Sequence, residues 1–199
     1  RGMVVAKSYE AKAGGIKTGT RLYEALSMCR GCLVIPQDHH SYYMTSHKLK
    51  EFLDTKIPEL EQYSIDEFFG DLRGWVRDED TKAFIVNLQK EIKDRFSLPV
   101  TIGASSSKWI AKLATSIAKP YGTKVVPKED IYEFIKDIDI DEFPGIGKAY
   151  SKKLRERMIH TLGDALGVKK MFYSWGKYGR DLYARIEGSD NEGILKCDS

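Results

Sequence analysis

The nine residues Tyr-Ser-Ile-Asp-Glu-Phe-Phe-Gly-Asp, positions 63 to 71, constrain the fold of this chain most. Their apolar members predict a buried strand: Ile65, Phe68 and Phe69. Yet two adjacent carboxylates, Asp66 and Glu67, stand in the middle of this stretch. A buried carboxylate costs free energy unless it is paired or bound to a metal. Because neighbouring strand residues face opposite sides, both carboxylates can reach one ion only at a strand end or beside a bulge.

Carboxylate oxygens suit Mg²⁺, which is usually bound by one or two protein carboxylates together with substrate phosphates. Asp66 and Glu67 are therefore candidate ligands of Mg²⁺. The alternative is a turn or a solvated strand end, which is the commoner use of an Asp-Glu pair taken alone. The surrounding segments decide between these interpretations.

The composition is that of a globular protein with one large or two small domains. The chain has 199 residues, of which 42% are apolar, and no apolar run approaches the roughly 18 residues of a membrane span. The net charge of +3, from 32 basic and 29 acidic residues, excludes a polybasic nucleic-acid binder but permits local basic patches. Three cysteines give no disulfide framework, so a reducing cytoplasm is expected.

Two clusters of metal-ligand residue types are predicted to be inert. Cys29 and Cys32 form a Cys-x-x-Cys without a second pair, so we expect unpaired, buried thiols followed by an apolar strand over 33–35. A loose cluster in a loop before a helix is expected to be surface residues: Asp38, His39, His40 and His47. Metal binding is the alternative for the second cluster.

The N-terminal segment predicts a strand over 3–6, a glycine-rich turn region and a short amphipathic helix over 21–29. Hydrogen-bond donors gather in the turn region: Tyr9, Lys12 and Lys17. Taken alone, this region is better explained as a solvated loop.

Strand and helix patterns alternate from Lys50 to Val126, which predicts an α+β unit whose antiparallel or mixed sheet has helices on one face. One of these helices begins in the serine cluster 105–107 and ends at Lys119, just before Pro120. The ammonium of Lys119 can therefore leave the core and reach a phosphate. A lysine favoured by the helix dipole is the alternative.

A second, all-helical unit is predicted to begin near Pro127. Its Pro-Gly-Ile-Gly at 144–147 precedes a basic amphipathic helix, as in a helix-hairpin-helix element. There the glycines let backbone N–H groups approach a phosphate of DNA without reading its sequence. The predicted DNA-binding residues are Gly145, Gly147, Lys148, Lys152 and Lys153. A solvated helix face is the alternative. An aromatic-rich helix over 172–186 closes this unit, and a frayed end is expected from 188.

Four of these segments resemble, in order, the motifs of the Y-family (DinB/UmuC-like) translesion DNA polymerases. They are Ser-Tyr-Glu-Ala-Lys with Gly-Ile-Lys-x-Gly at 8–19, Ser-Ile-Asp-Glu at 64–67, Lys-Pro-x-Gly at 119–122, and Pro-Gly-Ile-Gly at 144–147. The resemblance implies partial fingers over 1–37, a palm over 38–127 and a helix-hairpin-helix thumb over 128–199. Asp66 and Glu67 would hold the catalytic Mg²⁺.

The same resemblance implies a reaction and its substrates: template-directed nucleotidyl transfer from a dNTP to primer-template DNA past damaged bases. The dNTP phosphates would contact Tyr9, Lys12 and Lys119. The family usually has Arg at the position of Lys12, and often a Ser or Thr at the position of Ala6. A lysine offers a point charge instead of a bidentate fork, and an alanine lacks the hydroxyl donor. Both departures weaken the expected nucleotide contacts.

The family's first strand carries a further metal-binding aspartate that has no counterpart after Arg1, and its little-finger domain would follow Ser199. We therefore expect a chain that extends primers poorly by itself, with a sliding clamp as partner through regions outside it. The alternative function is a non-catalytic module that binds duplex DNA through the thumb. A weaker alternative is another palm-type enzyme, such as a nucleotide cyclase, which would not need the hairpin.

Overall fold

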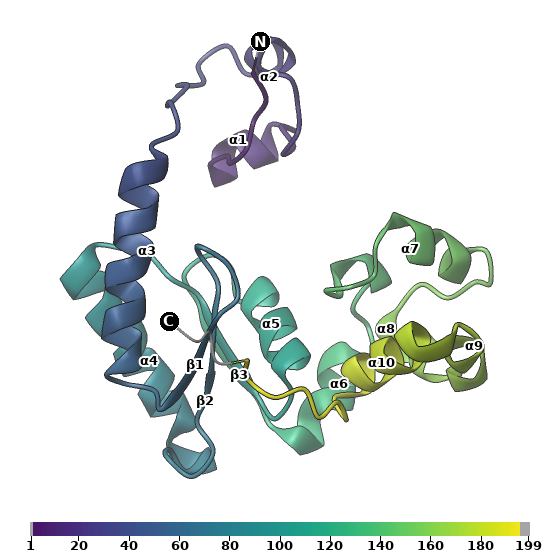
Figure 1. Cartoon of the computed structure of the whole chain (residues 1–199). Coiled ribbons are helices and arrows are strands. Elements are labelled where there is room, and N and C mark those ends of the chain that lie inside the picture. Colours follow the sequence, from purple (N-terminus) through teal and green to yellow (C-terminus); the bar gives the residue numbers. More distant parts are fainter. Residues whose placement is uncertain (1, 196–199) are drawn as a thin grey trace. The chain divides into compact units, whose positions relative to one another are not determined.

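The structure is a computed structural model that describes residues 2–195. The chain divides into two compact units, residues 1–40 and residues 41–199 (Figure 1). No helix in the described part of the chain is long and apolar enough to cross a membrane. The third cysteine, Cys197, and the end of the expected frayed terminus lie outside the described residues.

The first unit contains two short helices, α1 (Tyr9–Ala13) and α2 (Leu22–Met28). Ser8 caps α1 by accepting a hydrogen bond from the N–H of Ala11 at 3.2 Å. The strand predicted over 3–6 is wrong, because the segment forms only an isolated bridge from Met3 to Arg21. The facing backbone is a turn, so it offers no long strand to pair with.

The two cysteines of the Cys-x-x-Cys are joined by a disulfide, contrary to the unpaired thiols expected from the sequence. Cys29 ends α2, and a turn in which Cys32 N–H donates to Cys29 O at 3.2 Å follows. This turn places the two Cα atoms 5.5 Å apart, within the range that a disulfide spans.

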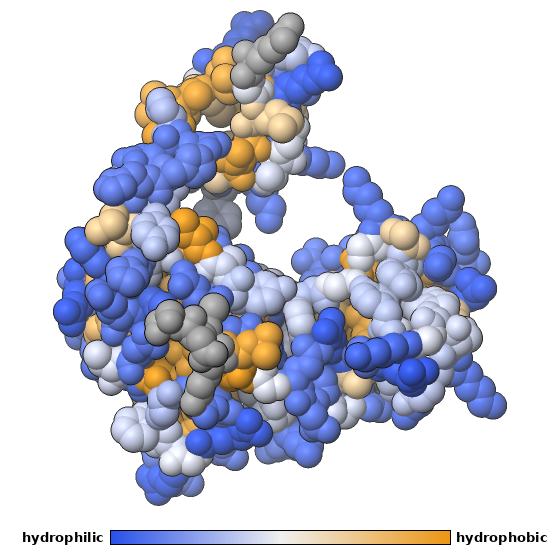
Figure 2. All heavy atoms as spheres, viewed as in Figure 1, coloured by the Kyte–Doolittle hydropathy of each residue, from blue (hydrophilic) through white to orange (hydrophobic). Residues whose placement is uncertain are grey.

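The segment after the disulfide is not the predicted apolar strand but an irregular connection to the next helix. Its apolar side chains are exposed, led by Leu33 at 84%. Figure 2 shows apolar atoms gathered over this connection between α2 and α3. No strand among the described residues pairs with this segment, so its apolar sequence alone does not make a sheet.

The second unit contains two pairs of strands. β1 (Glu59–Gln62) and β2 (Phe68–Asp71) form an antiparallel hairpin in which Gln62 pairs with Phe68. β3 (Ile102–Ser105) and β4 (Thr123–Val126) are parallel, because α5 (Lys108–Ile117) connects them as a crossover (Figure 1). The α+β class is confirmed, although the predicted sheet consists of two separate strand pairs.

Two long helices, α3 (His39–Asp54) and α4 (Thr81–Phe96), pack on the hairpin through an apolar cluster that includes Leu60 and Phe68. The next residues along the strands, Glu61 and Phe69, lie against Lys108 of α5 instead. Because adjacent strand residues face opposite sides, helices flank both faces, and the predicted one-face arrangement is wrong for this hairpin.

Helix α3 begins at His39, within the segment that was expected to be a loop before a helix. It therefore contains the three histidines expected in a loop: His39, His40 and His47. Among the described residues, no group of three or more His, Cys, Asp or Glu side chains gathers to hold a metal. All three histidines are exposed, as expected of surface residues.

The C-terminal part of the second unit is helical. Its helices are α6 (Ile131–Ile135), α7 (Lys148–Arg155), α8 (Leu162–Leu166), α9 (Lys169–Ser174) and α10 (Gly176–Glu187). Short 3₁₀ turns cover Lys128–Asp130 and Ile140–Glu142, and a further one, Asp78–Asp80, precedes α4. The helix predicted over 172–186 is broken where Gly176 has φ +74°, a conformation that glycine adopts without strain.

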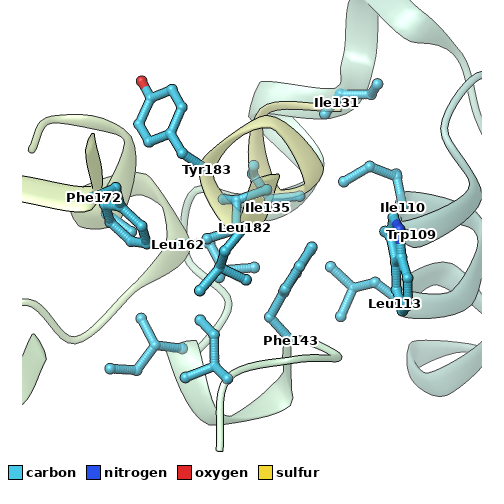
Figure 3. Close-up of a cluster of buried hydrophobic side chains, with 14 of the residues drawn as sticks. Trp109, Ile110, Leu113, Ile131, Ile135, Phe143, Leu162, Phe172, Leu182 and Tyr183 are labelled. Atoms are coloured by element: carbon cyan, nitrogen blue, oxygen red, sulfur yellow. The ribbon is translucent and has the colours of Figure 1, made fainter. Parts of the chain in front are cut away.

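These helices share one apolar cluster with α5. Figure 3 shows Phe143 pointing into this cluster together with Leu113 of α5 and Leu182 of α10. Each of the three side chains is at most 2% exposed. The core is therefore continuous from the β3–β4 crossover to the last helix, which makes α5 the element that joins the strand pairs to the C-terminal helices.

Candidate functional site

The two predicted metal ligands lie in the turn between β1 and β2. The backbone N–H groups of Tyr63 and Ser64 both donate to the carbonyl of Glu67, at 2.9 and 3.1 Å, and close this turn. The adjacent carboxylates therefore stand at a strand end, as expected. The buried strand predicted through Ile65 is wrong at that residue, because its side chain lies in the turn and is 48% exposed.

The two carboxylates have different partners. Asp66 is exposed and accepts a hydrogen bond from the Ser64 hydroxyl at 2.7 Å. Glu67 is half-buried, and its Oε2 accepts a hydrogen bond from Lys112 Nζ at 2.8 Å. One carboxylate thus has a neutral donor and the other a cation.

A second ion pair lies one helical turn earlier on α5. Lys108 Nζ is 2.7 Å from Glu61 Oε2, and each of these side chains is 6% exposed. The ammonium of Lys108 also lies 4.7 Å from the centre of the Phe69 ring. Sequence reasoning missed both lysines, for which the only signal is their i, i+4 spacing within an otherwise apolar helix.

The third carboxylate of the 63–71 stretch is separate from this pair. Asp71 lies at the other end of β2, opposite Glu59, and forms an ion pair with Arg73. The hydrogen bonds that Arg73 donates hold the pKa of Asp71 below its usual value. The hairpin thus brings together Asp66 and Glu67 and excludes Asp71.

The chemistry of this pair fits a hard divalent cation. Asp66 and Glu67 offer carboxylate oxygens on an accessible turn, and no third acidic, His or Cys side chain joins them within the described residues. Mg²⁺ accepts such a partial set because it keeps several waters and takes phosphate oxygens from a substrate. The donor set is therefore suited to an ion that arrives with a phosphorylated ligand.

Lys119 follows α5, whose C-terminal cap is Ala118. The loop doubles back tightly, since Gly122 N–H donates to Ala118 O at 3.0 Å, and the Lys119–Pro120 peptide is cis. Lys119 is exposed, and it lies beyond Lys112 in the direction away from Lys108. Helix α5 thus carries Lys108 and Lys112, and the exposed Lys119 follows its C-terminal end.

The other two predicted phosphate contacts belong to the first unit. Tyr9 is the first residue of α1 and Lys12 lies three positions on, so both occupy one face of this short helix. Tyr9 is 47% exposed and Lys12 is exposed.

The predicted DNA-binding hairpin forms an open groove of about 790 Å³. Gly145 has φ +102°, and its carbonyl accepts a hydrogen bond from the Tyr178 hydroxyl at 2.6 Å. Gly147 is the N-terminal cap residue of α7, and Lys148 and Lys152 line the groove beside it. Two of the predicted lysines are therefore on the same surface as the glycine turn.

The other basic residues of α7 are used differently. Lys153 lies over the rings of Tyr150 and Trp175, at 5.3 and 5.9 Å from their centres. Arg155 Nη2 reaches Asp139 Oδ1 at 2.6 Å and Asp141 Oδ2 at 2.8 Å. Its guanidinium therefore connects α7 to the preceding 3₁₀ turn, a role that the sequence did not suggest.

Comparisons with known proteins identify the family of the chain. The impB/mucB/samB family matches residues 1–116. DNA polymerase IV 1 of Halalkalibacterium halodurans is 32% identical over 200 residues, covering 98% of this chain and 48% of that protein. DNA polymerase IV of Alkaliphilus oremlandii is 33% identical over 199 residues, covering 97% of this chain and 49% of that protein.

Solved structures show the same likeness. DinB from Sulfolobus solfataricus superimposes with a TM-score of 0.83 at 26% identity, over 94% of this chain and 56% of that chain. An insertion ternary complex of Dbh DNA polymerase gives 0.84 at 26% identity, with the same shares covered. The chain spans about half the length of the curated relatives that it matches. It belongs to the impB/mucB/samB family and, with it, to the Y-family DNA polymerases.

Proposed function

We propose that this chain forms part of the active site of a translesion DNA polymerase, which joins a dNTP to a primer opposite a damaged template. The observation that carries the proposal is the exposed Asp66–Glu67 turn, which lies within the segment that the family matches. A turn of this kind presents two hard oxygen ligands to a phosphorylated substrate. Membership of the family supplies the reaction class.

Asp66 and Glu67 would hold Mg²⁺, which when bound neutralises phosphate charge and stabilises the leaving pyrophosphate. Lys119 would bind the triphosphate through its exposed ammonium. Tyr9 and Lys12 would add a hydroxyl and a second ammonium from one face of α1. Because a lysine makes no bidentate fork, these contacts would hold the phosphates mainly through charge.

The groove beside α7 would bind the backbone of the primer-template duplex. Gly145 and Gly147 let the backbone approach phosphates, and Lys148 and Lys152 supply charge without reading bases. Lys153 was also predicted to contact DNA, and its place over two aromatic rings leaves it a smaller part in this contact. A sliding clamp and a cytoplasmic location stay predictions.

The test is whether nucleotide binding depends on a divalent ion held by the turn. Calorimetric titration of the chain with dATP should show tighter binding with Mn²⁺ present than with EDTA. The variant Asp66→Asn/Glu67→Gln should lose that difference, because both carboxylate charges are removed. Asp71→Asn is the matched control, since Asp71 lies at the other end of β2 and pairs with Arg73.

Unchanged metal-dependent binding in the double variant would contradict a metal site at this turn. If DNA binding also persists in that variant, the result favours the alternative, a non-catalytic module that binds duplex DNA. Circular dichroism of each variant separates loss of binding from loss of fold.

A further inference from the structure

We propose that Lys112 acts as an internal counter-cation of the metal site, binding Glu67 until a divalent ion replaces it. The inference rests on the proposed function, because it assumes that Asp66 and Glu67 are the metal ligands. It adds a residue that the family resemblance did not bring forward. Lys112 is a positioning residue in this scheme, since it acts through Glu67.

The first observation is the difference between the two carboxylates. Glu67 Oε2 is 2.8 Å from Lys112 Nζ, whereas Asp66 has the Ser64 hydroxyl as its hydrogen-bond donor. A divalent ion that binds Glu67 therefore has to compete with a cation already there. The neutral hydroxyl that donates to Asp66 is no such competitor.

The second observation is that the pair is open to water. The side chain of Glu67 is 42% exposed and that of Lys112 is 20% exposed. Glu67 is the more exposed partner, so water screens the pair from that side and a dissolved cation can reach the carboxylate. The pair Lys108–Glu61 on the same helix is the contrast, with each side chain 6% exposed and Leu195 N–H also donating to Glu61 at 2.8 Å.

The third observation is that Lys112 has a second attractive environment beside Glu67. Its ammonium lies 4.3 Å from the centre of the Tyr63 ring and 5.9 Å from that of Phe69. A cation over an aromatic face keeps an electrostatic attraction after its carboxylate partner is taken. Lys112 can therefore release Glu67 without moving into bulk water.

The consequence is a weaker but better ordered metal site. Two adjacent carboxylates repel each other, and Lys112 offsets one charge while no ion is bound. An exposed ion pair of ordinary strength should raise the apparent Kd for the ion about two- to fivefold. Removing the ammonium should lower the Kd by that factor.

The test measures Mn²⁺ binding to the chain by electron paramagnetic resonance of the free ion, a readout independent of activity. Lys112→Gln should bind Mn²⁺ about two- to fivefold more tightly than the wild type. Lys112→Arg should stay near the wild type, because a guanidinium still pairs with a carboxylate. Lys90→Gln removes one exposed lysine from α4 and controls for net charge.

The results separate the two proposals. If Asp66→Asn/Glu67→Gln binds Mn²⁺ as tightly as the wild type, the metal site of the proposed function is wrong. If that variant loses binding while Lys112→Gln leaves the Kd unchanged or raises it, the metal site stands and the role of Lys112 is overturned.

A second measurement needs no variant. Nuclear magnetic resonance of ¹⁵N-labelled lysine ammonium groups should show the Lys112 signal shift on addition of Mg²⁺. The signal of Lys108 should stay in place, because its pair with Glu61 is buried. A Lys112 signal that stays unchanged at saturating Mg²⁺ would overturn the proposal.

Discussion

Two lysines on α5 show how burial decides what an ion pair does. Lys108 and Lys112 each bind one glutamate of the β1–β2 hairpin, with N–O distances of 2.7 and 2.8 Å. In the first pair each side chain is only 6% exposed, whereas in the second pair the side chain of Glu67 is 42% exposed. The same chemistry therefore gives a buried pair at one position and a partly exposed pair at the other.

We predict that Lys108→Met destabilises the protein by about 3–5 kcal/mol, because it leaves the buried Glu61 without its cation. The double variant Lys108→Met/Glu61→Leu should recover much of this loss, since no unpaired charge is left inside. Urea denaturation followed by circular dichroism gives both values. A single variant as stable as the wild type would show that water reaches Glu61.

At this scale, the sequence predicted Asp66 and Glu67 and their place at a strand end. It did not reveal the partner of Glu67, because Lys112 is 45 residues away in the sequence. A pairing over such a distance depends on how α5 packs on the hairpin, and local patterns carry no information about that. The pairing of Arg155 with Asp139 and Asp141 was missed for the same reason, since it depends on how the 3₁₀ turn packs on α7.

At the scale of elements, carboxylates secure the helices next to the predicted DNA groove. Asp164 accepts hydrogen bonds from the N–H groups of His160 and Thr161, both at 3.0 Å, and this lowers its pKa. The N–H of Asp141 and the guanidinium of Arg155 lower the pKa of Asp139. These contacts begin α8 and connect the 3₁₀ turn to α7.

We predict that the C-terminal helices lose stability as the pH falls below about 4. A carboxyl whose folded pKa is lowered stabilises the fold fully above its unfolded pKa, near 3.9, and that contribution disappears as the pH falls through the folded pKa. Asp164→Asn should lower stability at pH 7 by about 0.3–1 kcal/mol, because it removes a negative charge from the first turn of α8, and should reduce the pH dependence.

Urea midpoints between pH 7 and pH 3 measure this effect. Asp94→Asn, which removes an exposed carboxylate from α4, is the matched control. If the two variants show equal pH dependence, the cap at α8 is not the source.

Helices were predicted better than strands, for a physical reason. The pattern of α5, its Ser107 cap and its end before Pro120 are local, and the structure confirms them. A strand needs a partner, and the apolar residues 33–35 have none among the described residues. The disulfide was missed because it depends on the turn that follows α2, not on the number of cysteines.

At the scale of the whole molecule, the two units differ in how much core they have. Both apolar clusters consist of residues from the second unit, between Leu49 and Ile186. Among residues 2–40, the buried apolar side chains are those of Ile16 and Ala25. The second unit therefore contains nearly all the apolar burial that stabilises the described chain.

We predict that residues 41–199 fold by themselves with a urea midpoint close to that of the whole chain. This shorter chain should retain DNA binding, because the groove beside α7 is intact, and should bind dATP more weakly without Tyr9 and Lys12. Denaturation and fluorescence anisotropy measure the two properties. A large drop in the midpoint would show that the first unit stabilises the second.

Two sets of contacts limit the substitutions that helix α5 can accept. Its apolar side is set by the shape of the core, through Leu113 and its neighbours. Its lysines are set by the charges of the hairpin. Thr115 also has a partner, because its hydroxyl accepts a hydrogen bond from the N–H of Gly103 at 2.9 Å. Substitutions are therefore easier to accommodate in surface residues elsewhere than in α5.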